Sequence, residues 1–257
     1  MSQSNIEWTE LTWNPVTGCD KISPGCKFCY AEVMSHRLKA MGLNKYRDGF
    51  DVRTHPETLS IPFTWKKPKI VFVNSMSDLF HPDVPLDFIA AVFSVMNATP
   101  QHIYQVLTKR SDRLLQVSSR LKWTANIWMG VSIENQDYAY RINDLCKTPA
   151  NIKFLSIEPL IGPIKNLNLD SINWVIVGGE SGNKARPVKK EWIDTIKSHC
   201  ENKNVAFFFK QWGKANFNIN PNDPTIVSDH VQHAKGGCEL DGKIHRQMPA
   251  IYPNFQN

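Results

Sequence analysis

A repeated alternation of short apolar runs with amphipathic stretches constrains the fold of this chain more than any other feature. Each run of apolar, β-branched or aromatic residues ends in a polar cluster, and an amphipathic stretch follows. Six such runs lie at residues 69–74, 103–107, 127–131, 153–157, 174–177 and 206–209. Near-continuous apolar strands that alternate with helices are typical of a parallel sheet covered by helices.

This rhythm predicts an α/β fold, a partial or near-complete (βα)6–7 TIM-like barrel. A further strand is expected ahead of Cys19, and a helix is expected from Pro85 to Met96. The chain of 257 residues has the size at which such barrels form one domain.

In barrels of this kind the carboxyl ends of the strands carry the functional site. Polar residues follow the predicted strands at these ends, namely Asp78, Lys109, Arg110, Ser132, Glu134, Asn135, Glu158, Glu180 and Gln211. A single polar residue after a strand often caps the next helix instead. Because six strands end alike, a common pocket is the favoured interpretation.

Three cysteines near the amino end are the strongest chemical signal. Cys19 is separated by six residues from Cys26, and Cys29 follows after two more. A 4Fe-4S cluster normally takes four thiolates, so three clustered cysteines predict a cluster with one iron left open. A structural zinc site with His36 or His55 as a fourth ligand is the alternative. A thioredoxin-like redox pair is less favoured, because a loop and a third cysteine precede the Cys26/Cys29 pair.

The remaining composition gives broader expectations. Cys146, Cys200 and Cys238 are scattered, which predicts buried or incidental thiols. No apolar run approaches the roughly 20 residues of a membrane span, and the first residues do not resemble a secretory signal. We therefore expect a cytoplasmic protein with no membrane segment. A net charge of +6 is compatible with a nucleic-acid or nucleotide partner.

The motif residues also carry a resemblance. The ending CKFC at residues 26–29 resembles that of the radical S-adenosylmethionine signature, although that superfamily usually has three residues in the first gap where this chain has six. Over residues 5–213 the chain resembles a phage and prophage family of unknown function with a three-cysteine motif. The blocks that carry this resemblance lie at residues 13–19, 23–31, 73–81, 105–110, 178–182 and 208–213.

The resemblance implies a cofactor and a reaction type. Cys19, Cys26 and Cys29 would hold three irons of a 4Fe-4S cluster, and S-adenosylmethionine would chelate the fourth. One electron from an external reductant would cleave the sulfonium and give a 5′-deoxyadenosyl radical that abstracts hydrogen from the substrate. By the same analogy, the methionyl ammonium would bind Ser75, Ser77 and Asp78, and the ribose hydroxyls would bind Ser132, Glu134 and Asn135.

Charge and backbone shape suggest further roles. Lys109 or Arg110 is a candidate for pairing with the methionyl carboxylate or a substrate phosphate. Gly178 and Gly179 would let the backbone approach the cofactor closely, with Glu180 nearby. Glu158 and Gln211 are candidates on the substrate side. Tyr30 is expected to pack in the core rather than to close over adenine.

The chain changes character after Gly213. We expect residues 1–213 to form the barrel domain and residues 214–257 to form a loop-rich extension that could act as a lid. A short hairpin around residues 240–243 is favoured over a zinc site made of His230, His233, Cys238 and His245.

The leading expectation is a radical S-adenosylmethionine enzyme that acts on a nucleoside, nucleotide or nucleic acid. Two alternatives stay open. One is the same chemistry on a small molecule or peptide, and the other is a non-enzymatic zinc or iron-sulfur module that supports a partner protein.

Overall fold

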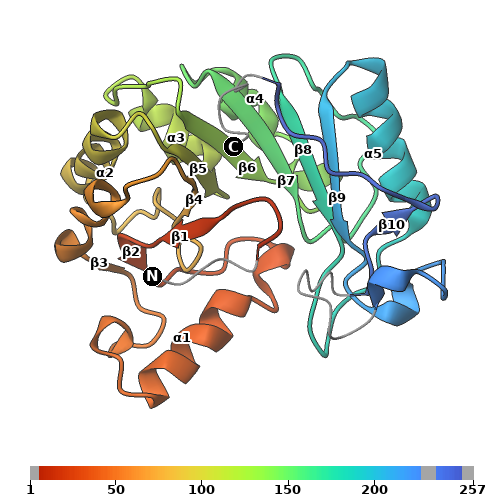
Figure 1. Ribbon diagram of the computed structural model, residues 1–257, viewed down its shortest axis with the longest axis horizontal. Helices are drawn as coiled ribbons and strands as arrows, with labels where there is room; N and C mark the ends of the chain where they lie inside the picture. The colour runs from red at the N-terminus through yellow and green to blue at the C-terminus, as the bar shows by residue number, and fades with distance from the viewer. Residues whose placement is uncertain (1–5, 227–235, 251–257) are drawn as a thin grey trace. The chain divides into compact units, whose positions relative to one another are not determined.

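The computed structural model describes residues 6–226 and 236–250, and these residues form two compact units. Of these residues, unit 1 comprises 6–131 and 147–152, and unit 2 comprises 132–146, 153–226 and 236–250. Both units alternate parallel strands with helices (Figure 1). The α/β class and the parallel strands are therefore confirmed.

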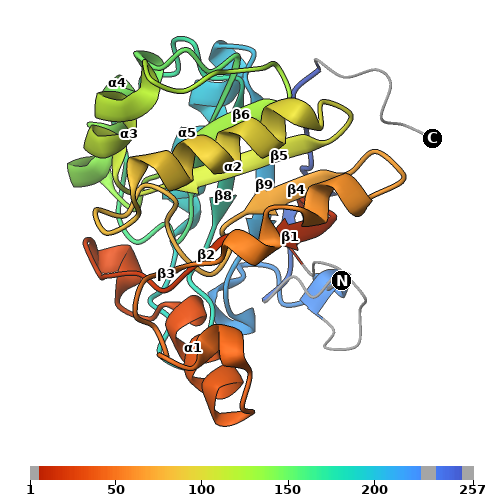
Figure 2. The same cartoon turned by 90° about the vertical axis from the view of Figure 1, so that its left-hand side faces the viewer.

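Unit 1 contains parallel strands in the order β1, β4, β5 and β6, which span Leu11–Trp13, Ile70–Val73, Ile103–Thr108 and Ile127–Ser132. Its helices are α1 (Tyr30–Ala40), α2 (Leu86–Ala98) and α3 (Ser111–Ser118). Helix α2 lies along the strands, whereas α1 lies apart from α2 and α3 (Figures 1 and 2). A short antiparallel pair of β2 (Val16–Thr17) and β3 (Arg53–Thr54) adds to this unit.

Unit 2 contains parallel strands in the order β7, β8 and β9, which span Ile152–Ile157, Trp174–Gly178 and Ala206–Gln211. Helix α4 spans Arg141–Cys146, and helix α5 (Lys190–Asn202) packs beside β9. The predicted hairpin is confirmed, because β10 (Glu239–Leu240) pairs antiparallel with β11 (Lys243–Ile244). Asp241 and Gly242 both have positive φ, as a tight two-residue hairpin turn requires.

Short 3-10 helices connect these elements. In unit 1 they span Pro24–Cys26, Asn44–Tyr46, Pro56–Thr58 and Ile61–Thr64. In unit 2 they span Gln136–Tyr138, Ala215–Phe217 and Pro224–Ile226.

Aromatic side chains contact one another in the core of each unit. In unit 1 the ring centroids of Trp13 and Tyr104 lie 5.9 Å apart, and both side chains are buried. In unit 2 the ring of Trp174 lies 5.7 Å from that of Phe154 and 6.0 Å from that of Phe208. Such rings bury large apolar areas and prefer tilted or edge-to-face contacts. Within the described residues, no helix has both the length and the apolarity needed to cross a membrane.

The boundary expected at Gly213 stays a prediction.

The histidines His230 and His233 lie outside the described residues. Of the other two ligands of that disfavoured zinc site, Cys238 is buried and His245 Nε2 lies 3.2 Å from the Leu240 carbonyl oxygen.

Candidate metal and cofactor site

The cysteine loop is fixed to the body of unit 1 at Gly18. Gly18 N–H donates to the Met76 carbonyl at 3.2 Å, and Cys19 N–H donates to the Phe50 carbonyl at 3.1 Å. Gly18 has a φ of +81°, and a Cβ at this position would lie 2.0 Å from the Asp51 carbonyl oxygen. Only glycine fits here, so the backbone at Gly18 sets the place of Cys19.

The three thiols lie along a short segment of irregular chain. Cys19 follows β2, Cys26 ends a 3-10 helix, and Cys29 caps the amino end of α1. All three are free and partly exposed. Cys26 Sγ lies 3.5 Å from the Ser23 hydroxyl.

Electrostatic interactions link the thiols to one another and to nearby cations. Burial raises the pKa of the Cys19 thiol to about 11, Asp78 and Cys26 add to this rise, and Arg110 opposes it. The hydrogen bond to Glu32 raises the pKa of Lys21, and Cys29 and Cys26 raise it further. The loop therefore sets three thiols beside two cations.

These donors suit an iron-sulfur cluster. Within residues 6–226 and 236–250, no three His, Cys, Asp or Glu side chains are close enough to ligate a single ion. A 4Fe-4S cluster binds each cysteine at a different iron, so its ligands need not converge on one point. Soft thiolates also select such clusters, and cations offset their negative charge.

The two histidines considered as a fourth zinc ligand, His55 and His36, lie in different environments. His55 is buried, with Nε2 2.8 Å from the Thr17 hydroxyl and Nδ1 3.2 Å from Glu57 Oε1. Both of its ring nitrogens are thus engaged within unit 1. His36 lies exposed on α1.

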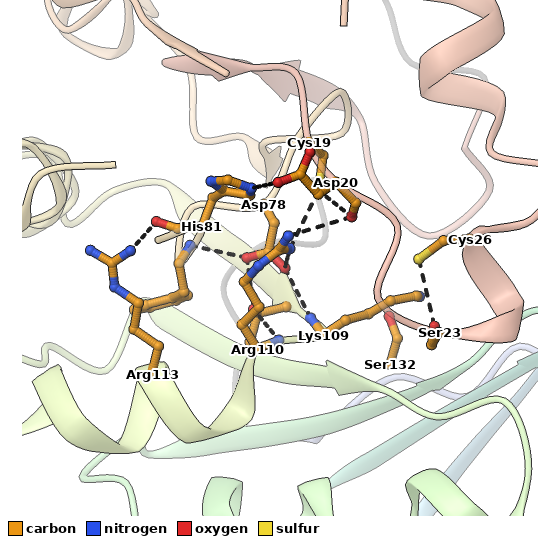
Figure 3. Close-up of polar contacts among 12 residues, drawn as sticks. Cys19, Asp20, Ser23, Cys26, Asp78, His81, Lys109, Arg110, Arg113 and Ser132 are labelled. Carbon is orange, nitrogen blue, oxygen red and sulfur yellow. Dashed lines mark hydrogen bonds and ion pairs between the residues drawn. The ribbon is translucent and has the colours of Figure 1, made fainter. Parts of the chain in front are cut away.

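Asp78 and Arg110 form a buried ion pair beside Cys19 (Figure 3). Arg110 Nη1 lies 3.1 Å from Asp78 Oδ2 and 3.3 Å from Cys19 Sγ. Asp78 also accepts hydrogen bonds from the Thr108 hydroxyl at 2.7 Å and from the backbone N–H groups of Phe80 and Lys109. The carboxylate is thereby saturated by unit 1 itself.

The serines after β4 hold a turn. Asn14 Oδ1 accepts from the Ser75 hydroxyl at 3.1 Å and from Met76 N–H at 3.2 Å. The Ser77 hydroxyl donates to the Val16 carbonyl at 2.8 Å. The binding of a methionyl ammonium by Ser75 and Ser77 stays a prediction. Tyr30 is exposed and donates to the Ser75 carbonyl, so the expectation that it packs in the core is wrong.

The sequence reasoning missed Asn14, Asp20 and His81 as site residues. His81 is buried; its Nδ1 accepts from Asp83 N–H at 3.1 Å, and its Nε2 lies 2.9 Å from Asp20 Oδ2. Figure 3 shows His81 and Asp20 beside the Asp78–Arg110 pair. Asn14 and His81 lie inside the sequence blocks at 13–19 and 73–81, which was the available signal.

In unit 2, Ser132 and Glu134 contact one arginine. Arg141 Nη1 lies 2.8 Å from the Ser132 carbonyl and 3.1 Å from Glu134 Oε2, and both charged side chains are buried. The guanidinium of Arg141 also stacks over the Tyr138 ring at 4.5 Å. Asn135 differs from Ser132 and Glu134, because its buried Oδ1 accepts no hydrogen bond. A ribose-binding role for these residues stays a prediction.

The two glycines at the end of β8, Gly178 and Gly179, make room for groups of unit 2 itself. A Cβ on Gly178 would lie 3.2 Å from Glu158 Oε1, and one on Gly179 would lie 2.2 Å from the Trp212 carbonyl oxygen. Glu158 Oε1 is also 2.7 Å from Lys210 Nζ and 3.3 Å from Gln211 Nε2.

Glu180 pairs with Arg186, accepting from Arg186 Nε at 2.8 Å and from its backbone N–H at 2.9 Å. Lys210 and Arg186 were not singled out from the sequence. Each is a long cation whose partner is set by side-chain orientation.

Together, the fold and the site define a class: α/β proteins of parallel strands that carry a loop of three free thiols beside a buried arginine-carboxylate pair. The chain belongs to the family described as "Protein of unknown function (DUF5131)", whose model matches residues 3–249. No curated protein and no solved structure matches the chain.

Proposed function

We propose that this protein is a radical S-adenosylmethionine enzyme and that Cys19, Cys26 and Cys29 hold its 4Fe-4S cluster. The observation that carries the proposal is the set of three free, partly exposed thiols on one loop of unit 1. When bound, such a cluster supplies the electron that cleaves S-adenosylmethionine to methionine and a 5′-deoxyadenosyl radical.

The residues around the loop supply its binding environment. Asp78 orients the Arg110 guanidinium, and Arg110 and Lys21 bring positive charge to the thiolates. The turn that Asn14 makes with Ser75 and Met76 fixes the backbone after β4.

A nucleoside, nucleotide or nucleic acid is the proposed substrate class. The net charge of +6 and the resemblance to phage and prophage proteins support modification of nucleic acid. Turnover requires an external one-electron reductant, which a partner protein would supply. The free state of all six cysteines agrees with a reducing, cytoplasmic setting.

Anaerobic reconstitution with iron and sulfide tests the proposal. We expect about four irons per chain, with 5′-deoxyadenosine formed after reduction in the presence of S-adenosylmethionine. A triple alanine variant of Cys19, Cys26 and Cys29 should lose both the iron and the product. Cys146→Ser is the matched control, because this partly exposed thiol donates to the Asp170 carbonyl in unit 2.

Three outcomes separate the candidate functions. Iron bound equally by the triple variant would refute the ligand assignment. A cluster that never cleaves the cofactor would leave an iron-sulfur module, and zinc bound in place of iron would leave a zinc module.

A further inference from the structure

Arg110 makes the three cysteines of the loop unequal. Its guanidinium donates from Nη1 to Cys19 Sγ at 3.3 Å and from Nη2 to the Asp20 carbonyl at 3.4 Å. Cys26 Sγ contacts the neutral hydroxyl of Ser23. A buried, permanently charged donor thus meets one sulfur of the loop, and a neutral group meets another.

The geometry of the network fixes where the Arg110 charge lies. Asp78 Oδ2 binds Nη1 at 3.1 Å, and the other contacts of this carboxylate are with Thr108, Phe80 and Lys109. The backbone N–H of Arg110 also donates to the Thr108 hydroxyl at 2.9 Å. The side chains of Arg110 and Asp78 are each 7% exposed, so water screens the contact weakly.

From this geometry we propose that Arg110 is a positioning residue that holds a charged hydrogen bond on the Cys19 thiolate and raises the reduction potential of the cluster. This inference rests on the proposed function. A positive donor at a ligand sulfur stabilises the added negative charge of the reduced cluster more than that of the oxidised one. Asp78 aims the guanidinium and is itself a positioning residue.

The proposal changes the role expected for Arg110. A guanidinium that already binds Asp78, Cys19 and the Asp20 carbonyl has few donors left for a methionyl carboxylate or a phosphate. Lys109 stays the candidate anion partner, and its backbone N–H donates to Asp78 Oδ2 at 3.1 Å.

Redox titration of the reconstituted protein tests this inference. Arg110→Lys keeps a charge but loses the fork that reaches Asp78 and Cys19 together. We expect the equilibrium constant for cluster reduction to fall about tenfold or more, as the loss of one charged hydrogen bond implies. Iron content should stay at the wild-type level.

The matched control is Arg113→Lys. Arg113 lies on α3, three residues from Arg110, and donates to the carbonyls of His81 and Val84 rather than to a thiol. The reduction potential of the cluster in Arg113→Lys should equal that in the wild-type protein.

A second variant guards against unfolding. Removal of Arg110 alone leaves the buried Asp78 carboxylate without its charged partner, which is costly. The double variant Asp78→Asn with Arg110→Gln removes two charges that act on Cys19 in opposite directions, together with the hydrogen bond to Cys19 Sγ. Because the two charges offset each other, loss of this hydrogen bond should still lower the potential.

The possible failures are distinct. A wild-type protein that binds no cluster would overturn the proposed function and this inference together. Suppose instead that the wild-type protein forms a cluster and that both Arg110 variants have the reduction potential of the wild-type protein. The inference is then overturned and the proposed function stands.

Discussion

His102 is a buried histidine whose ring packs edge-on against two aromatic side chains in unit 1. Its ring centroid lies 5.2 Å from that of Trp65 and 6.2 Å from that of Tyr104. Burial lowers the pKa of this imidazole, although a hydrogen bond with the Pro62 backbone opposes the shift. The folded chain therefore favours the neutral ring.

The direction of the pH dependence follows from this shift. Because the pKa is lower in the folded state, the unfolded chain binds more protons below about pH 6.5, and stability falls as the pH falls through that range. We expect His102→Phe, which keeps the aromatic packing, to show a smaller loss of Tm than the wild-type protein between about pH 7.5 and pH 5. Thermal melts followed by circular dichroism measure this difference.

His36→Asn is the control, because it removes a histidine that lies exposed on α1 rather than one buried in the core. An equal loss of Tm in the His102→Phe and wild-type proteins would show that His102 does not contribute.

Residue types at the strand ends could be predicted, but their partners could not. The polar run after a strand placed Asp78 and Arg110 at the carboxyl ends of β4 and β5. That they pair with each other and with Cys19 depends on side-chain rotamers over separations of 32 and 91 residues. Tyr30 shows the opposite error: its aromatic character suggested burial, yet it is 56% exposed at the start of α1.

At the scale of elements, the turn at Gly18 tests how the cysteine loop is anchored. Gly18 and Gly42 have similar φ angles of +81° and +76°. A Cβ at Gly18 meets the Asp51 carbonyl oxygen at 2.0 Å, whereas a Cβ at Gly42 meets no atom within 4 Å. An alanine at Gly42 would therefore introduce backbone strain alone, whereas an alanine at Gly18 would add a steric clash to that strain.

We expect Gly42→Ala to lower the free energy of unfolding by roughly 1–2 kcal/mol, the cost of a left-handed alanine. Gly18→Ala should cost distinctly more, because the Asp51 backbone must move as well, and it should weaken iron binding by the loop. Urea unfolding gives the first quantity and iron content after reconstitution gives the second. Equal losses of stability in the two variants would mean that the loop moves freely around Gly18.

The long strands and α2 could be predicted from the local pattern of apolar residues, whereas α1 and the short strands could not. The six predicted strands and the helix α2 lie within two residues of their expected ends, because long apolar runs are buried whatever their neighbours. No comparable apolar run marks α1, in which only Ala31 and Ser35 are buried. The pair of β2 and β3 joins segments of two residues each, and its formation depends on contacts made elsewhere.

At the scale of the whole molecule, the division into units had no local marker. Unit 2 takes residues 132–146 from the middle of the chain, so its extent is set by long-range contacts rather than by a linker. Composition, in contrast, applies to the chain as a whole, and its excess of cations allows the proposed substrate class to be tested.

The balance of 30 Lys and Arg against 24 Asp and Glu leads to the last prediction. Lys and Arg side chains that bind the phosphates of a nucleic-acid substrate would release the counterions of the nucleic acid, so the logarithm of affinity should fall linearly with the logarithm of salt concentration. We expect fluorescence anisotropy with a labelled single-stranded RNA or DNA of about 20 nucleotides to show this slope, steeper than that for a mononucleotide.

Heparin serves as the control polyanion, because an equal affinity for it would indicate charge attraction without recognition of bases. A difference between RNA and DNA of the same sequence would identify recognition of the 2′-hydroxyl. If neither polymer binds at low salt while S-adenosylmethionine is still cleaved, the net charge does not serve substrate binding. The radical chemistry would then act on a small molecule or peptide, and the strand-end residues of unit 2, Glu158 and Gln211 first among them, become the positions to vary.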